Sequence, residues 1–184
     1  MPRYLALLRG INVGGRSKVA MADLRDVATS LGHAAVATYI QSGNLLFASA
    51  DTDAASLADA LEAEIAGRLG VRPAVIVLSA PDLAQVITDN PFPAEANPRY
   101  VHAIFHRDPI DPSAIARVTA AVQRARESGS RDDAVVVGRA LYVHTPDGFG
   151  RSDLAAQLTR KSVQPAGTAR NWATVTKLMA MLGE

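Results

Sequence analysis

Residues 35–48 of this chain read AVATYIQSGNLLFA, and this stretch is central to the predicted fold of the first half of the sequence. Two β-rich runs, 35–41 and 44–48, are separated by only Ser42 and Gly43. This spacing is typical of antiparallel strands joined by a two-residue turn, because glycine readily adopts the positive φ that such a turn needs. The stretch therefore predicts a tight β-hairpin.

Outward from this hairpin, the sequence predicts a helix and then a strand on each side. Apolar residues recur at helical spacing in two runs, which are Leu24, Val27, Ala28 and Leu31 before the hairpin and Leu57, Leu61, Ile65 and Leu69 after it. Gly32 and Gly70 follow these runs and are placed to end the helices with a left-handed residue. Short apolar runs at residues 3–8 and 74–78 predict buried strands. The resulting order, β-α-β-β-α-β, is that of a ferredoxin-like unit.

The second half repeats this order after a proline-rich joint. Four prolines lie between Pro81 and Pro98, which predicts a subdomain boundary in that region. The expected elements are a helix from Ser79, a strand at 100–105, a helix capped by Asp111 and Pro112, a hairpin of strands 134–137 and 141–144, a short helix after Ser152 and a terminal helix from about Ala169. We therefore predict an α+β fold of two ferredoxin-like β-α-β-β-α subdomains in tandem, residues 1–90 and 91–184, with extra C-terminal helices.

Composition disfavours several classes of function. The chain has 19 Lys and Arg against 18 Asp and Glu, so a net charge of +1 gives no general attraction to nucleic acids or anionic membranes. The absence of cysteine excludes disulfides, thiol nucleophiles and sulfur-ligated metals. Arg9 and Gly10 end the first apolar run too early for a signal peptide or a membrane span. We expect a cytoplasmic protein with no membrane partner.

Three motifs resemble a bacterial family known as domain of unknown function 1697. They are LLRGINVGG at residues 7–15, TYIQSGN at residues 38–44 and TARNWATV at residues 168–175. The resemblance covers nearly the whole chain and implies an α/β fold of two ferredoxin-like subdomains. It implies no activity, because the family has no established catalytic residues. Catalytic residues are therefore unassigned, and whether the protein is an enzyme stays open.

Residues 10–18, GINVGGRSK, carry the most informative chemistry of the sequence. They match the spacing of a phosphate-binding P-loop, except that Arg16 stands where the lysine is expected. In a P-loop the lysine lies in the first turn of the helix, whereas the apolar helical pattern here begins only near Met21. The expected strands also lack a terminal aspartate for magnesium. A nucleoside triphosphatase is therefore disfavoured.

Two interpretations of this loop stay open. One is a long glycine-rich connection that only turns the chain. The other is an anion site in which backbone N–H groups converge with cationic side chains. Its candidate ligand-binding residues are Arg9, Asn12, Gly14, Gly15, Arg16 and Lys18.

The predicted topology places the hairpin turn beside this loop. The first and second strands of a β-α-β-β-α-β sheet run in the same direction, so the loop after the first and the turn after the second lie at the same end. Gln41, Ser42 and Asn44 would then add amide and hydroxyl groups to the site. The alternative is that Ser42 and Gly43 serve only as turn residues.

The predicted terminal helix has two faces. Its apolar stripe is Trp172, Val175, Met179 and Leu182, which we interpret as core. Arg170, Thr174 and Lys177 share the other face, and Thr168 is the expected N-cap. One interpretation is a solvated basic face. The other is that Thr168, Arg170, Asn171 and Lys177 hold one anion together with residues 10–18.

Catalytic and metal constellations are weak. His102, His106 and Asp108 would project to one side of an extended strand, which suggests a metal site. A solvated sheet face explains them more simply, so we expect no metal and no cofactor. The function that we expect is binding of a small anionic ligand, such as a nucleotide, a phosphorylated metabolite or a carboxylate. One alternative is a single-stranded nucleic-acid binder, which the sparse aromatic residues disfavour. The other is a protein–protein interaction or structural role, and the oligomeric state is not predicted.

Overall fold

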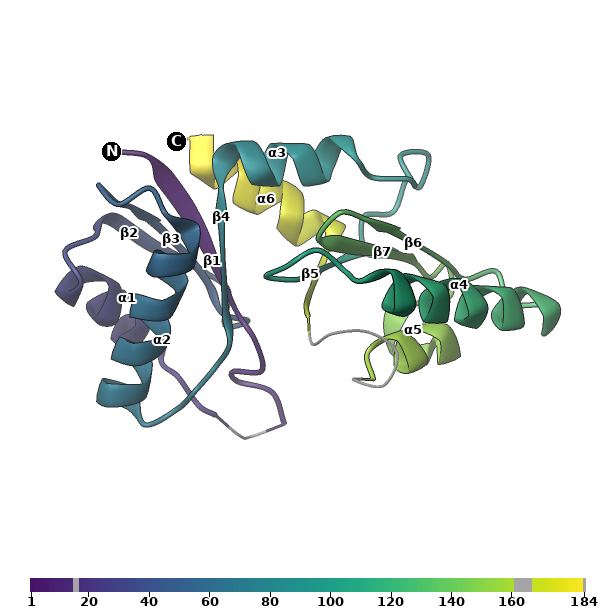
Figure 1. Cartoon of the computed structure of the whole chain (residues 1–184), viewed down its shortest axis with the longest axis horizontal. Helices are drawn as coiled ribbons and strands as arrows, with labels where there is room; N and C mark the ends of the chain where they lie inside the picture. Colours follow the sequence, from purple (N-terminus) through teal and green to yellow (C-terminus); the bar gives the residue numbers. More distant parts are fainter. Residues whose placement is uncertain (15–16, 161–166, 184) are drawn as a thin grey trace. The chain divides into compact units, whose positions relative to one another are not determined.

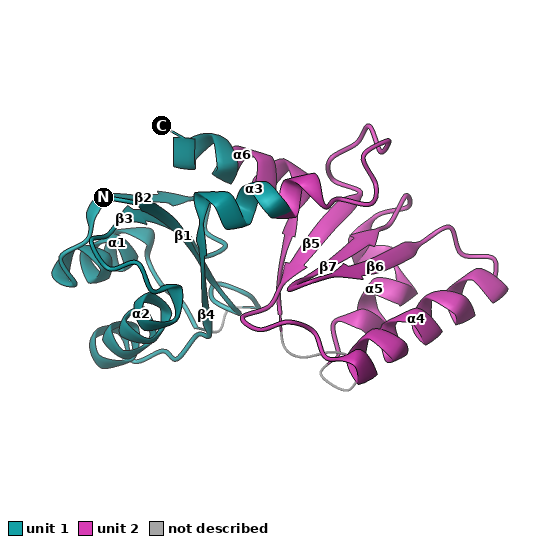
Figure 2. Cartoon of the chain, turned by 45° about the horizontal axis from the view of Figure 1, so that its top comes forward, with its two compact units in different colours: residues 1–85, 178–184 teal, residues 86–177 magenta. Residues whose placement is uncertain are grey.

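The computed structural model of the chain describes residues 1–14, 17–160 and 167–183 (Figure 1). These residues form a mixed α+β fold with two four-stranded antiparallel sheets and six α-helices. The chain divides into two compact units (Figure 2): unit 1 is Met1–Gln85 with Leu178–Glu184, and unit 2 is Val86–Lys177. The predicted domain boundary between residues 90 and 91 stays a prediction.

Unit 1 contains the elements predicted outward from the first hairpin. They are β1 (Arg3–Leu8), α1 (Met21–Ser30), β2 (Ala34–Tyr39), β3 (Asn44–Ala48), α2 (Ala54–Leu69) and β4 (Val75–Ser79), followed by α3 (Ala80–Thr88), within which the division between the units falls. The sheet order is β2-β3-β1-β4, and β1 is antiparallel to both β3 and β4. The predicted order of elements is confirmed for this half.

Local sequence explains why the helices of unit 1 begin, end and pack where they do. The Asp53 carboxylate accepts hydrogen bonds from the first N–H groups of α2, and Gly70 ends this helix with φ of 69°. Helices α1 and α2 lie on one face of the sheet (Figure 1). Their apolar stripes pack against it, and Leu24, Leu61 and Phe47 are fully buried. The helical periodicity therefore predicted the core-facing side correctly.

The first hairpin has a wider turn than the sequence predicted. β2 ends at Tyr39 and β3 begins at Asn44, so the turn comprises residues 40–43 rather than Ser42 and Gly43 alone. The Asn44 side-chain amide is fully buried and donates to the Tyr39 carbonyl at 3.0 Å and to Ser42 Oγ at 2.9 Å. These bonds hold the ends of a four-residue turn together, and so the prediction of a two-residue turn was wrong.

Unit 2 repeats the order of elements around a second sheet. Its elements are β5 (Val101–Phe105), α4 (Pro112–Glu127), β6 (Asp133–Val137), β7 (Ala140–His144), the 3-10 helix η1 (Phe149–Arg151), α5 (Asp153–Leu158) and β8 (Thr168–Asn171). The sheet order is β6-β7-β5-β8, and α4 and α5 contribute to the core on one of its faces. The predicted cap at Asp111, the short helix after Ser152 and the two-residue turn between β6 and β7 are confirmed.

The start of the terminal helix differs from the prediction. Thr168–Asn171 forms β8, which pairs with β5, and α6 (Trp172–Gly183) begins only after it. Thr168 and Arg170 point to the buried side of this strand, and the Asn171 Oδ1 caps α6 by accepting from the Thr174 N–H at 2.9 Å. A helix from about Ala169 and an N-cap at Thr168 were therefore wrong. The buried positions of β8 are the polar residues Thr168 and Arg170, so its sequence lacks the apolar alternation that predicts a strand.

In residues 1–14, 17–160 and 167–183, no helix combines the length and the apolar character that a bilayer span needs.

Candidate functional site

Asn12 fixes the long loop that connects β1 to α1. Its backbone has φ of 55°, and its Oδ1 accepts a hydrogen bond from the Val19 N–H at 2.9 Å. Its Nδ2 donates to the Val19 carbonyl at 2.9 Å and to the Gln41 carbonyl at 3.0 Å. The Asn12 N–H donates to the Ser17 carbonyl at 3.1 Å. One side chain thus closes the loop on itself and ties it to the hairpin turn.

The loop and the hairpin turn lie at the same end of the sheet, which confirms their predicted placement beside each other. The Leu8 N–H donates to the Gly43 carbonyl at 2.8 Å. A Cβ atom at Gly43 would lie 2.9 Å from the Cβ of Leu8 and 3.1 Å from the side chain of Ile11. Gly43 also has φ of 80°, so this position needs glycine for both its conformation and its close contact.

A depression of about 370 Å³ lies where the loop meets the turn. We call it the loop depression. The residues that line it are Asn12, Lys18, Val19, Ala20 and Gln41. Lys18 and Gln41 are exposed and offer an ammonium and an amide to a ligand. The structure thus brings together three of the predicted site residues, Asn12, Lys18 and Gln41.

The other predicted residues of unit 1 have different positions. Arg9 is partly buried and its N–H donates to the Ala74 carbonyl at 2.9 Å, while Gly14 is exposed in the loop with φ of 59°. Ser42 and Asn44 bond to each other within the turn and serve its structure. Gly15 and Arg16 fall outside the described residues.

The geometry around α1 differs from that of a P-loop. α1 begins at Met21, three residues after Lys18, and its N-cap Ala20 contributes no side-chain hydrogen bond. The basic and hydroxyl residues at positions 16–18 therefore precede the helix, and they are not in its first turn. The predicted late helix start is confirmed.

The predicted residues near the C-terminus belong to unit 2 and are largely structural. Arg170 is only 7% exposed, and its Nη1 donates to Thr168 Oγ1 at 2.8 Å and to the Ala169 carbonyl at 2.8 Å. Burial lowers the pKa of Arg170 to about 10, so it remains charged at neutral pH. Arg170 lies in β8 while Thr174 is buried in α6, so the predicted basic face shared with Lys177 was wrong; Lys177 alone is exposed.

The predicted joint anion site assumed free N–H groups at the start of the terminal helix. Two N–H groups at the start of α6 are already bonded, since the Trp172 N–H donates to the Pro98 carbonyl at 3.0 Å and the Thr174 N–H to Asn171 Oδ1 at 2.9 Å. These two groups are therefore not the free donors that the hypothesis assumed. The joint site itself stays a prediction, and the loop depression of unit 1 is the candidate that we take forward.

The histidines considered for a metal have separate environments. His102 stacks on Phe149 with ring centroids 4.1 Å apart, and burial lowers its pKa to about 4. His106 is buried, and its Nδ1 lies 3.3 Å from the Arg139 carbonyl. In the part of the chain that the structure describes, no three acidic or histidine side chains gather as metal ligands.

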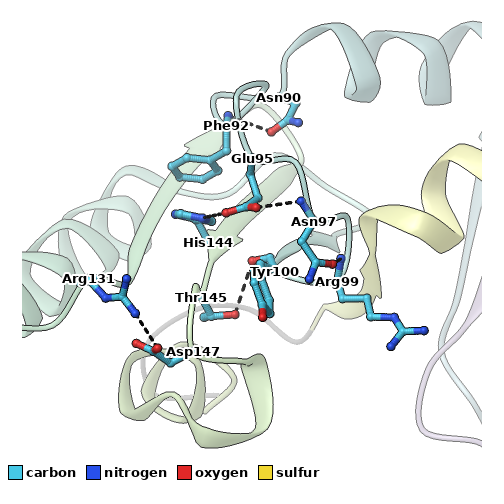
Figure 3. Close-up of polar contacts among 10 residues, drawn as sticks. All are labelled: Asn90, Phe92, Glu95, Asn97, Arg99, Tyr100, Arg131, His144, Thr145 and Asp147. Atoms are coloured by element: carbon cyan, nitrogen blue, oxygen red, sulfur yellow. Dashed lines mark hydrogen bonds and ion pairs between the residues drawn. The ribbon is translucent and has the colours of Figure 1, made fainter.

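Sequence reasoning missed a polar cluster of unit 2 on the segment before β5 (Figure 3). Glu95 Oε2 lies 2.7 Å from Nε2 of His144, whose ring stacks on Phe92 with centroids 5.2 Å apart. The Asn97 N–H donates to Glu95 at 2.8 Å, and this bond, followed by the contact with His144, lowers the pKa of Glu95. Glu95 and His144 are far apart in the sequence and no local pattern links them.

Comparison with known proteins gives a family but no reaction. The model of a family described as Protein of unknown function (DUF1697) matches residues 1–142. The solved structure of the conserved bacterial protein SP0830 from Streptococcus pneumoniae is similar, with a TM-score of 0.74 and 26% sequence identity over 98% of each chain. No curated protein sequence matches this chain.

Proposed function

We propose that this chain, which belongs to the DUF1697 family of proteins of unknown function, binds a small anionic ligand at the loop depression of unit 1. Its membership of the family agrees with the resemblance seen in the sequence motifs. The ligand class is a nucleotide, a phosphorylated metabolite or a carboxylate. No catalytic step is part of the proposal.

The length of the loop is the observation that carries this proposal. Between β1 and α1 the chain uses residues 9–20, which are 12 residues, whereas between β5 and α4 it uses residues 106–111, which are 6 residues. Both connections join a central strand to the next helix. The fold therefore does not require the additional length in unit 1, and loops longer than their connection needs are often functional.

The backbone of the loop supports anion binding. Positive φ angles occur at Gly10, Asn12 and Gly14, with 71°, 55° and 59°, while the residues between them are outside this region. Positive φ angles at alternate positions are a feature of concave anion-binding nests, in which neighbouring N–H groups point to one side. The Asn12 N–H is used within the loop, so we expect the anion near Gly14 and the Lys18 ammonium.

The finer fold assignment is also a proposal. In both sheets the first strand of the unit lies between its third and fourth strands, an order that supports a ferredoxin-like topology for each unit. The aromatic side chains of Tyr4, Phe47 and Tyr142 are buried, which gives no support to base stacking on these sheets. We also propose a cytoplasmic location, which suits a chain without cysteine.

Isothermal titration of the full chain with inorganic pyrophosphate, AMP and citrate tests this function. We expect saturable binding of pyrophosphate, and AMP and citrate compare the nucleotide and carboxylate classes with it. Lys18→Gln should weaken pyrophosphate binding by roughly tenfold, because a charge-assisted hydrogen bond is lost. Arg25→Gln removes an exposed cation that donates to Thr38 and does not line the loop depression, so it is the matched control. Equal weakening by both variants would show non-specific attraction and contradict the proposal.

A further inference from the structure

Unit 2 contains a cavity of about 400 Å³ that the site in unit 1 does not explain. It lies where the end of α4 and the turn after it approach η1 and the start of α5. We call it the mixed-charge cavity, because its lining includes Arg124, Arg131, Asp132, Asp147, Arg151 and Asp153. None of these six residues was predicted from the sequence to belong to a site.

Two of these charges neutralise each other at the rim. Arg131 Nη2 lies 2.6 Å from Asp147 Oδ1, and the two side chains are 67% and 68% exposed (Figure 3). This pair adds no net charge to the cavity and is screened by solvent. The charges left to meet a ligand are two arginines and two aspartates.

Asp132 is the buried carboxylate of this cavity. It is 9% exposed, and its Oδ2 accepts a hydrogen bond from Ser152 Oγ at 2.7 Å. Ser152 is itself buried and caps α5 by accepting from the Ala155 N–H at 2.9 Å. Among the described residues no cation lies within ion-pair distance of Asp132. A buried carboxylate is stabilised by a positive partner, so this position favours a cationic group on a ligand.

The two remaining arginines present positive charge to the same cavity. Arg124 lies in the last turn of α4, and Arg151 ends η1 with its guanidinium against Gly148, 3.8 Å from where a Cβ of that glycine would lie. Neither forms an ion pair with another described residue. Guanidinium groups bind carboxylates through paired hydrogen bonds, so these residues favour an anionic group on a ligand.

We propose that the mixed-charge cavity binds a small zwitterion of the amino-acid class, with its ammonium at Asp132 and its carboxylate at Arg124 and Arg151. A simple anion would be repelled by Asp132 and Asp153, and a simple cation by the arginines. A dipolar molecule satisfies both sets, and the volume lies within the range of small-molecule sites. This site differs from the proposed anion site in its unit and in its ligand.

Titration calorimetry of the full chain with zwitterions of increasing length and with singly charged controls tests the charge pattern. The zwitterions are glycine, β-alanine, 4-aminobutyrate and 6-aminohexanoate, and the singly charged controls are butyrate and butylammonium. We expect one zwitterion to bind at least about tenfold more tightly than either control, with the best chain length reporting the spacing of the two charges. Binding of butyrate alone, equal binding of all compounds, or no binding would overturn the proposal.

Two neighbouring arginines provide a matched pair of variants. Arg124→Gln should weaken the best zwitterion by roughly tenfold. Arg126→Gln, in the same turn of α4, removes a cation that pairs with Asp133 at 2.7 Å and does not line the cavity, so binding should be unchanged. Asp132→Asn should weaken the zwitterion as well. If that variant does not fold, Arg151→Gln tests the cavity without altering a buried group, and unchanged binding in it would overturn the proposal.

Discussion

The two units share an order of elements and an order of strands, and they differ at one end of the sheet. In unit 1 the connection after the first strand has 12 residues (9–20) and the hairpin turn has four (40–43). In unit 2 the same connections have six (106–111) and two (138–139). The shorter connections are sufficient for the topology. The additional length in unit 1 is the observation on which the proposed anion site rests.

The attachment of the loop to the turn is common to both units. In unit 2 the His106 N–H donates to the Arg139 carbonyl at 3.0 Å, as the Leu8 N–H donates to the Gly43 carbonyl at 2.8 Å in unit 1. Beyond this contact, unit 1 has further chain that Asn12 braces and that exposes Lys18. The backbone hydrogen bond to the turn therefore occurs in both units and is structural. The additional loop residues occur in unit 1.

The largest effect is expected at the glycines of the two hairpin turns. Gly43→Ala should destabilise the protein by about 2–4 kcal/mol, because the new Cβ meets the backbone-proximal Cβ of Leu8 and the residue has a positive φ. Gly138→Ala has nothing within 4 Å of its new Cβ, so only the cost of φ remains, about 1 kcal/mol. Urea unfolding measures both, and equal losses would contradict the close packing in unit 1.

The next largest effect is a loss of stability on acidification that arises from His102 in unit 2. Burial lowers the pKa of His102 in unit 2 to about 4 from its ordinary value of 6.5, so the unfolded chain binds a proton more readily than the folded chain. The full contribution to stability is present above pH 6.5 and decreases as the pH falls toward 4, by roughly 2–3 kcal/mol. His33 of unit 1, which stacks on Phe47, has a pKa lowered in the same direction, with burial the larger cause and Asp51 opposing it.

His102→Phe isolates the contribution of unit 2. The variant keeps an aromatic contact with Phe149 and removes the titrating group. Chemical unfolding between pH 4 and 7 should then show a smaller loss of stability on acidification than the original protein. An unchanged pH dependence would indicate that other groups dominate it.

Asn12 tests the hydrogen bonds that hold the long loop of unit 1 to its hairpin turn. Asn12→Ala removes three side-chain hydrogen bonds from partly exposed positions and places alanine at positive φ, for an expected cost of about 1–2 kcal/mol. Asn12→Gly loses the same bonds without the φ penalty and should cost less. Amide hydrogen exchange should show the loss of protection at Val19. Full protection there in Asn12→Ala would contradict this role of Asn12.

Shortening the loop should have the smallest effect on stability. Replacement of residues 13–17 by two glycines leaves Asn12, Val19 and α1 in place, so the free energy of unfolding should change by less than about 1 kcal/mol. Binding of pyrophosphate should be lost in the same variant. A protein that no longer folds would show that the segment is a required connection.

Hydrophobic period predicted most of this fold, and long-range contacts account for what it missed. The stripes of α1 and α2 and the cap at Asp111 depend on neighbours within a few residues, so the sequence alone indicates them. β8 is defined by its pairing with β5, more than 60 positions earlier in the sequence. Local periodicity does not report such a pairing, so a helix was predicted at these residues.

The candidate sites show the same division. Topology alone placed the loop beside the hairpin turn, and the Asn12 contact with Gln41 confirms it. The wide turn depends on the side chain of Asn44, which no turn rule includes. The mixed-charge cavity depends on Asp132 meeting Ser152, 20 positions away, and on the ends of two helices. Hydrophobic periodicity in the sequence does not predict a contact of this kind.

A backbone-amide NMR titration with inorganic pyrophosphate tests the central claim most directly, because it observes both units in one experiment. We predict saturable shifts at residues 10–18 and 41–43 of unit 1, with no comparable change at residues 106–111 and 138–139 of unit 2. Saturable shifts at the two ends alike, or no saturable shift in the loop of unit 1, would contradict the claim that its additional length forms an anion site.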